Sequence, residues 1–188
     1  MAYRNGTYVA FHANGTNRPG ESDISYYNLL KAWSGKGDDS FTFINSHDKA
    51  SAVRDSSKAE TLRRSLNERL KNSKNMLLII GDTTKDDDDW VPFEINKAVD
   101  TYKLPLIIAY TKSVHNGSLI RNPNALSEYW PDVLKEKIES SSINAIHIPF
   151  SKNVINDAIG QFNHTKPPLG KGLGIYSDDA YRSFGFAL

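Results

Sequence analysis

One carboxylate, Glu94, stands in a context that could do chemistry. It lies in the string Trp90-Val91-Pro92-Phe93-Glu94-Ile95, which follows an apolar run, 76–81, and an acidic loop, 82–89. The apolar run is typical of a buried strand, and the residues after the loop recur with helical period. Glu94 is therefore predicted in the first turn of a helix, just beyond the carboxyl end of a central strand. Open α/β sheets place their ligand sites there.

Glu94 also has a purely structural interpretation. Acidic residues stabilise the first turn of a helix by roughly 0.3–1 kcal/mol. The run Asp86–Asp89 can supply an N-cap, and Pro92 is tolerated in the first turn. These effects explain an acid near the start of the helix, but not one that follows Trp90 and is embedded among apolar residues. Both interpretations stay open on the residues alone.

The rest of the chain supplies the elements that must position Glu94. Apolar patterns predict strands over 7–11, 41–44, 76–80, 104–110 and 144–149, and helices over 24–33, 62–70, 90–102, 125–140 and 154–162. Strands that alternate with helices imply βαβ units with right-handed crossovers. The predicted fold class is α/β, a flavodoxin-like three-layer sandwich with a central, mainly parallel five-stranded sheet. We expect one domain over residues 1–166. A Gly/Pro-hinged aromatic C-terminal tail over 167–188 is expected to pack on the domain or on a partner.

Composition restricts the class of protein. The chain has 188 residues, a formal net charge of +1 and no cysteine. The balanced charge argues against nucleic acid or a membrane surface as a partner, and the lack of cysteine excludes disulfides and thiolate metal sites. No apolar run approaches the ~20 residues needed to span a bilayer, and the N-terminal residues lack the layout of a signal peptide. We therefore expect a cytoplasmic protein, without a metal site among its scattered histidines.

Several motifs, taken in order, resemble one family. The string that ends in Glu94-Ile95 resembles the Trp-x-x-x-Glu signature on the catalytic helix of Toll/interleukin-1 receptor (TIR) domains. Four further segments are similar to the TIR-like branch found in bacterial Thoeris anti-phage systems: Val9 to His12, Phe43 to Asp48, Arg54-Asp55, and the helix 62–70 with Asn72-Ser73 after it. Together the matches cover about residues 7 to 110.

The resemblance implies an enzyme that uses NAD+ as its substrate and needs no bound cofactor. Many bacterial TIR domains cleave NAD+ at the nicotinamide–ribose bond and release nicotinamide with ADP-ribose or a cyclised ADP-ribose. In Thoeris systems the resemblance implies a cyclic ADP-ribose isomer, made after phage infection, that activates a separate effector protein. It also implies self-association, because TIR domains work as assemblies in which a neighbouring subunit completes the pocket.

A single carboxylate suits this chemistry. Nicotinamide leaves as a neutral group, so the difficult part is the positive charge that develops on the ribose. Glu94, the predicted catalytic residue, would stabilise that charge and hold a ribose hydroxyl. Trp90 would form a wall against the ribose or nicotinamide ring. Substrate contacts are also predicted from the end of the first strand and from the loop 45–57 after the second, namely Phe11, His12, Ala13, Ser46, Asp48 and Arg54.

The roles of these contacts differ in kind. Asp48 is suited to a ribose hydroxyl and Arg54 to a phosphate. Two of these residues also have structural interpretations in place of substrate contact: His12 as a contact within its own loop, and Arg54 as a solvated surface charge. Ala10 stands where related sequences often carry serine, and this departure at the pocket rim bears on substrate preference.

Three other functions use the same fold. A TIR-like adaptor that acts through self-association or partner binding is the main alternative, although it does not need Glu94 beside Trp90. A nucleoside deoxyribosyltransferase would form a covalent ribosyl-glutamate. A comparison of NAD+ with deoxynucleosides as substrates distinguishes it from an NAD+-cleaving enzyme. A phospho-receiver domain needs an acidic pair after the first strand, which here ends in Phe11-His12-Ala13, so that function is excluded.

Overall fold

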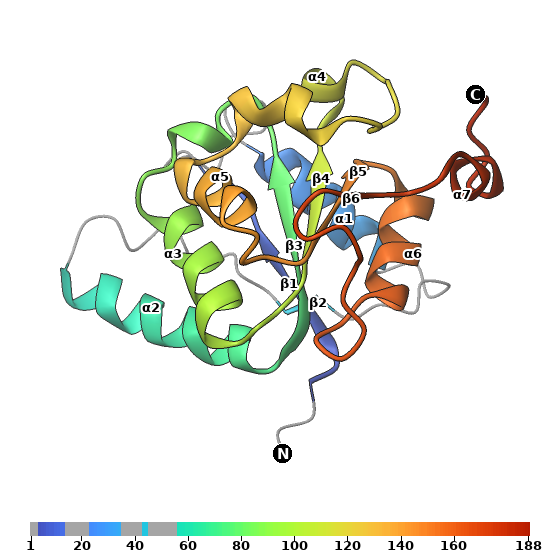
Figure 1. Cartoon of the computed structure of the whole chain (residues 1–188). Helices are drawn as coiled ribbons and strands as arrows, with labels where there is room; N and C mark the ends of the chain where they lie inside the picture. Colours follow the sequence, from blue (N-terminus) through green and yellow to red (C-terminus); the bar gives the residue numbers. More distant parts are fainter. Residues whose placement is uncertain (1–3, 14–22, 35–42, 45–55) are drawn as a thin grey trace.

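A single parallel sheet organises the chain. The computed structural model describes residues 4–13, 23–34, 43–44 and 56–188. Within them the strands run in the order β2-β1-β3-β4-β5-β6, and every pairing is parallel. Helices cover both faces of the sheet (Figure 1). The predicted flavodoxin-like α/β fold is confirmed, and a sixth strand extends the expected five-stranded sheet at one edge.

The strands follow the predicted apolar runs closely. They are β1 (Gly6–Ala10), β2 (Phe43–Ile44), β3 (Ser73–Ile80), β4 (Leu106–Tyr110), β5 (Ala145–Pro149) and β6 (Gly174–Ile175). On β3, Met76, Leu78 and Ile80 face one core cluster, whereas Leu77 and Ile79 face the other. A strand covered on both faces needs apolar residues at every position, which explains the unbroken run.

Helices of different sequence regions cover the two faces. On one face lie α2 (Ser56–Lys71), α3 (Trp90–Asn96) and α5 (Asp132–Glu139), and on the other α1 (Ile24–Ser34) and α6 (Lys152–Gln161) (Figure 1). The helix predicted over 90–102 is α3 followed by a π-helical turn, η3 (Lys97–Thr101). No helix in the described part of the chain is both long and apolar enough to cross a membrane.

The single helix predicted over 125–140 is wrong. The segment forms a 3-10 helix, η4 (Pro123–Tyr129), and then α5, with Trp130 in an extended conformation between them (φ −83°, ψ 137°). Pro131 follows Trp130, and a proline disfavours helical backbone in the residue before it. A short helix, α4 (Lys112–His115), precedes η4 at the carboxyl end of β4.

The C-terminal tail returns to the sheet. Its strand β6 pairs with β5, and Gly174 permits this approach, since a Cβ there would lie 2.6 Å from the carbonyl oxygen of Ala145. The helix α7 (Asp178–Ser183) then brings Tyr181 into the core cluster on the α1 and α6 face, beside Tyr176. The rings of Tyr176 and Tyr181 meet edge to face at 6.1 Å, a favourable aromatic geometry. The tail segment is thus part of the packed structure.

A buried chain of hydrogen bonds also ties the tail to the sheet. Trp130 Nε1 donates to the hydroxyl of Tyr110 at 2.7 Å, and that hydroxyl lies 2.7 Å from Nδ1 of His147. His147 Nε2 lies 2.7 Å from the carbonyl oxygen of Gly172, which can only accept, so Nε2 carries the proton and Nδ1 accepts from Tyr110. Burial lowers the pKa of His147 to about 4. The ring is therefore neutral near neutral pH, as this chain of donors requires.

Candidate functional site

The Glu94 carboxylate lies between the second turn of α3 and strand β1. The predicted first-turn position of Glu94 is wrong, because the helix begins at Trp90 and its first turn holds no acidic residue. Its side chain is 0% exposed, and its Oε1 accepts a hydrogen bond from the hydroxyl of Tyr8, which is also fully buried. A buried carboxylate is costly unless it is hydrogen-bonded. Because sheet order reverses between β1 and β3, this position is also the switch point where flavodoxin-like folds bind ligands. The group therefore meets two physical criteria for a functional site.

Electrostatics define which partner carries the proton. Burial, followed by the negative charge of Glu94 and the hydrogen bond to it, raises the pKa of Tyr8 well above 10.0. Tyr8 is therefore a neutral phenol that donates its proton toward Glu94. A neutral donor aimed at a carboxylate stabilises the ionised form of that carboxylate.

The acidic run before α3 is built into the start of the helix. Asp87 is 8% exposed, and its Oδ1 lies 2.8 Å from the backbone nitrogen of Trp90 and 3.3 Å from that of Val91. Asp89 instead pairs with Arg63 of α2 at 2.6 Å. Two of the four acids thus have structural partners, which reduces the negative charge that this run presents to an anionic ligand.

Trp90 is held between the core and α2. Its ring is half-buried, packs against the core cluster that includes Tyr8, and has the guanidinium carbon of Arg63 at 5.4 Å from its centroid. The same guanidinium lies 5.8 Å from the ring of Phe93. Trp90 and Glu94 share α3 one turn apart, as predicted, and Arg63 already occupies part of the Trp90 ring surface.

A second polar network joins the carboxyl ends of β1 and β3. His12 Nδ1 lies 3.2 Å from the hydroxyl of Thr83, and the carbonyl oxygen of His12 accepts from the backbone nitrogen of Asp23 at 3.2 Å. Thr84 Oγ1 accepts from the backbone nitrogen of Gly81 at 2.7 Å and donates to Asp23 Oδ2 at 2.9 Å. Burial raises the pKa of Asp23 to about 6, although the bond from Thr84 opposes the shift. A Cβ at Gly81 would lie 1.9 Å from Asp23 Oδ1, so a larger residue there would displace the Asp23 carboxyl group.

The other predicted substrate contacts fall in different places. Phe11 is 1% exposed and stacks on Tyr27 at 4.9 Å, in the core cluster on the face opposite Tyr8 and Glu94. Ala13 packs against that same cluster. Of the three predicted contacts at the end of β1, His12 is therefore the one that lies among polar groups at the carboxyl ends of the strands. The predicted contacts Ser46, Asp48 and Arg54 lie outside the described residues.

Two polar residues were missed by the sequence-based prediction of the site. Tyr8 was treated only as a strand residue, although it alternates with Val9 and so faces the α3 side together with Ala10. That alternation was the available signal, because α3 follows the neighbouring strand. Asp23 directly precedes α1, and nothing in its local sequence indicates burial.

A cavity lies apart from Glu94. It has a volume of about 240 Å³ between α4 and η4, and its lining includes Val114, His115, Leu119, Arg121 and Leu126. None of the predicted site residues contributes to it. Among the described residues, no group of three or more His, Cys, Asp or Glu side chains is arranged to hold a metal ion. The candidate site is therefore chosen by the chemistry of Glu94 and its hydrogen-bond partner, and not by the size of this cavity.

A parallel flavodoxin-like sheet with a buried carboxylate on the helix after its central strand is the arrangement expected of a TIR-like domain. The family model described as "Thoeris protein ThsB, TIR-like domain" matches residues 8–116. The chain belongs to this family, and the resemblance inferred from the motifs is confirmed. The matched region runs from Tyr8 through Glu94 to the end of α4, so it includes the candidate site.

Proposed function

We propose that this chain is a TIR-like NAD+ glycohydrolase or ADP-ribose cyclase of anti-phage defence, with Glu94 as its catalytic carboxylate. The observation that carries the proposal is the buried Glu94 carboxylate, bonded to a neutral tyrosine at the switch point of the sheet. Membership of the Thoeris TIR-like family supports the same substrate, because many bacterial TIR domains cleave NAD+.

Cleavage of the nicotinamide–ribose bond requires one negative charge beside the ribose. As the nicotinamide–ribose bond breaks, its electron pair leaves with the nicotinamide nitrogen and positive charge develops on the ribose. A carboxylate shielded from water stabilises that charge more strongly than a solvated one does. The ADP-ribosyl cation is then captured by water, which gives ADP-ribose, or by an atom of the same molecule, which gives a cyclic product.

The remaining predicted contacts extend this site. Trp90, one turn before Glu94, would pack against the ribose or nicotinamide ring, and His12 would contact substrate from the end of β1. Asp48 and Arg54 keep their proposed roles toward a ribose hydroxyl and a phosphate. NAD+ is the substrate in this proposal, and no further cofactor is required.

The burial of Glu94 adds a requirement. Because its side chain is 0% exposed, NAD+ reaches it only if substrate binding or self-association opens the space beside it. Self-association of TIR domains would provide such a change. The nucleotide product would then act on a separate effector protein in the cytoplasm of a bacterial cell, without nucleic acid or membrane as partners.

The same burial favours a second candidate function. A non-catalytic TIR-like adaptor needs no contact between Glu94 and a ligand, and a buried Tyr–Glu pair then serves only to join β1 to α3. The two candidates differ in one measurable property, which is turnover of NAD+ that depends on the Glu94 charge.

The test uses purified full-length chain incubated with NAD+, with nicotinamide and nucleotide products separated by chromatography and identified by mass. Glu94→Gln keeps an oxygen that accepts from Tyr8 but removes the charge. The matched control is Glu128→Gln, which changes an exposed glutamate on η4. Deoxynucleosides offered in place of NAD+ test the deoxyribosyltransferase. Turnover of NAD+ that is lost in Glu94→Gln alone supports the enzyme, whereas equal turnover in both variants contradicts the role of Glu94.

A further inference from the structure

We infer that Tyr8 is the positioning residue for the catalytic carboxylate, an inference that rests on the proposed function of Glu94. The Tyr8 hydroxyl donates to Oε1 of Glu94 from an element 86 residues away in the chain. Tyr8 belongs to β1 and Glu94 to α3. The hydrogen bond therefore fixes the carboxylate relative to the sheet, and not only within its own helix.

Tyr8 is a rigid anchor for this purpose. Its position on β1 is in register with Ile44 of β2 on one side and Met76 of β3 on the other. Its ring is fully buried in the core cluster formed under α2 and α3. Catalytic groups work when they are held within about 0.5 Å of the productive geometry by side chains that are themselves locked in place. An immobile phenol can in this way hold the glutamate side chain, which has one more rotatable bond.

Electrostatics keep Tyr8 in its protonated form. Burial and the negative charge of Glu94 raise the pKa of the Tyr8 phenol, so its hydroxyl retains the proton that it donates toward Glu94. Among the described residues, the charge of Arg69 of α2 opposes this rise and that of Tyr27 of α1 adds to it.

A merely structural role for the bond has to be separated from a positioning role. Tyr110 provides a matched control, since it is also a fully buried strand tyrosine in the same core cluster. Its hydroxyl bonds to Trp130 and His147 rather than to Glu94. Tyr8→Phe and Tyr110→Phe thus each remove one buried, bonded hydroxyl and keep the ring, but only the first touches the carboxylate.

The experiment measures steady-state cleavage of NAD+ across pH for the wild-type chain and both variants. Loss of a hydrogen bond to a charged group predicts that Tyr8→Phe lowers kcat roughly 10- to 100-fold and changes KM less than about threefold. The acid limb of its pH–rate profile moves to higher pH, because the ionised carboxylate has lost a donor. Tyr110→Phe keeps kcat within about threefold of wild type, because it removes no contact to the reacting groups.

A second measurement does not depend on turnover. The carboxyl carbon of Glu94 is followed by NMR during pH titration of the wild-type chain and of Tyr8→Phe, and we expect a higher titration midpoint in the variant. Equal kcat in the two tyrosine variants, or an unchanged midpoint, overturns the inference. If the wild-type chain itself does not cleave NAD+, the proposed function fails, and the NMR titration alone decides whether Tyr8 holds the carboxylate.

Discussion

The carboxylate of Asp87 caps the helix that begins at Trp90: its Oδ1 lies 2.8 Å from the backbone nitrogen of Trp90. The same oxygen lies 3.1 Å from the backbone nitrogen of Asp89 and 3.3 Å from that of Val91. Helix N-termini leave their first N–H groups without partners inside the helix, and one buried carboxylate satisfies three of them here. The position of Glu94, one turn further on, therefore depends on an acid outside the helix.

Removal of this cap should destabilise the fold. We expect Asp87→Ala to lower the free energy of unfolding by about 1–2 kcal/mol, the usual cost of losing an N-cap side chain. Asp88→Ala, at an exposed neighbouring acid, should change it by less than about 0.5 kcal/mol. Chemical denaturation of both variants measures the difference. Equal stability of the two variants would show that the bonds to Asp87 contribute nothing net.

His147 should make stability depend on pH in one direction. Its pKa is lowered from 6.5 to about 4 in the folded chain, so the unfolded chain binds the proton more readily between these values. The stabilisation is fully present above pH 6.5 and is lost as the pH falls toward 4, by an amount on the order of 3 kcal/mol. Asp23 shifts in the opposite direction, so this trend is best measured by denaturation in an Asp23→Asn background. A flat profile in that background would contradict a neutral buried His147.

The titration of Asp23 should lower the free energy of unfolding as the pH rises, opposite to the effect of His147. Its pKa is raised from 3.8 to about 6 by burial, so the folded chain holds the proton more readily. Stability from this group is fully present below pH 3.8 and is lost as the pH rises through 6, by an amount on the order of 3 kcal/mol. His147→Gln, which keeps a donor and an acceptor side by side, should leave this trend visible in denaturation curves. Stability that rises from pH 4 to pH 7 in that variant would be the contrary result.

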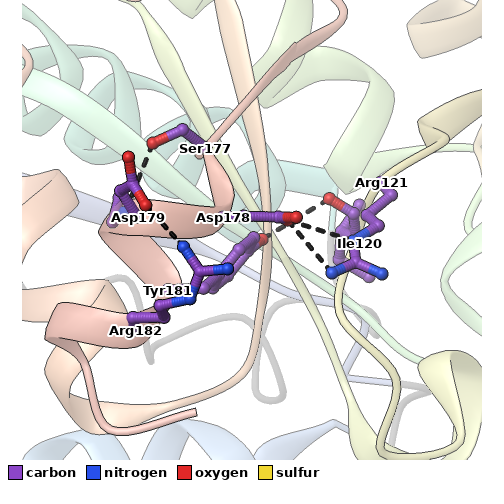
Figure 2. A network of polar contacts seen from close by, with 8 residues as sticks. Ile120, Arg121, Ser177, Asp178, Asp179, Tyr181 and Arg182 are labelled. Atoms are coloured by element: carbon purple, nitrogen blue, oxygen red, sulfur yellow. Dashed lines mark hydrogen bonds and ion pairs between the residues drawn. The ribbon is translucent and has the colours of Figure 1, made fainter. Parts of the chain in front are cut away.

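The contacts of α7 allow packing and charge to be compared (Figure 2). Tyr181 is fully buried, whereas Arg121 and Asp178 form an ion pair at 3.0 Å with their side chains 56% and 54% exposed. We expect Tyr181→Ala to cost about 3–5 kcal/mol through loss of the buried ring. Arg121→Ala should cost less than about 1 kcal/mol, because exposed ion pairs contribute little.

The hydroxyl of Tyr181 should contribute much less than its ring. It lies 3.5 Å from the carbonyl oxygen of Ile120, a long and weak contact, so Tyr181→Phe should leave the free energy of unfolding nearly unchanged. Thermal melts of the three variants test this order, and a larger loss for Arg121→Ala than for Tyr181→Ala would reverse it.

The fold could be predicted where periodicity is strong. The run that became β3 and the helical period that became α3 placed Glu94 correctly on the helix that follows a central strand. The break before Pro131 has a signal in the sequence, because a proline disfavours helical backbone in the residue before it, but the predicted helix over 125–140 did not use it. Strand β6 has two residues, too few for any pattern to indicate.

The contacts of the site could be predicted less well than its location. The bond between Tyr8 and Glu94 joins residues 86 positions apart, and no local pattern encodes such a pair. The burial of Asp23 depends on Gly81 and Thr84, which lie in the segment after β3, about 60 residues further along the chain. Sequence patterns thus indicate which edge of the sheet carries the candidate site, whereas the partners of each polar group follow only from three-dimensional packing.

The most direct test of the central claim is mass spectrometry of nucleotides from cells that express the chain, with and without phage challenge, beside cells that express Glu94→Gln. We predict loss of NAD+ and a new product with the mass of ADP-ribose or cyclic ADP-ribose in the wild type, and neither change in the variant. Unchanged nucleotides in the wild type under both conditions, with folding of the protein verified by circular dichroism, would contradict the enzyme and favour the adaptor.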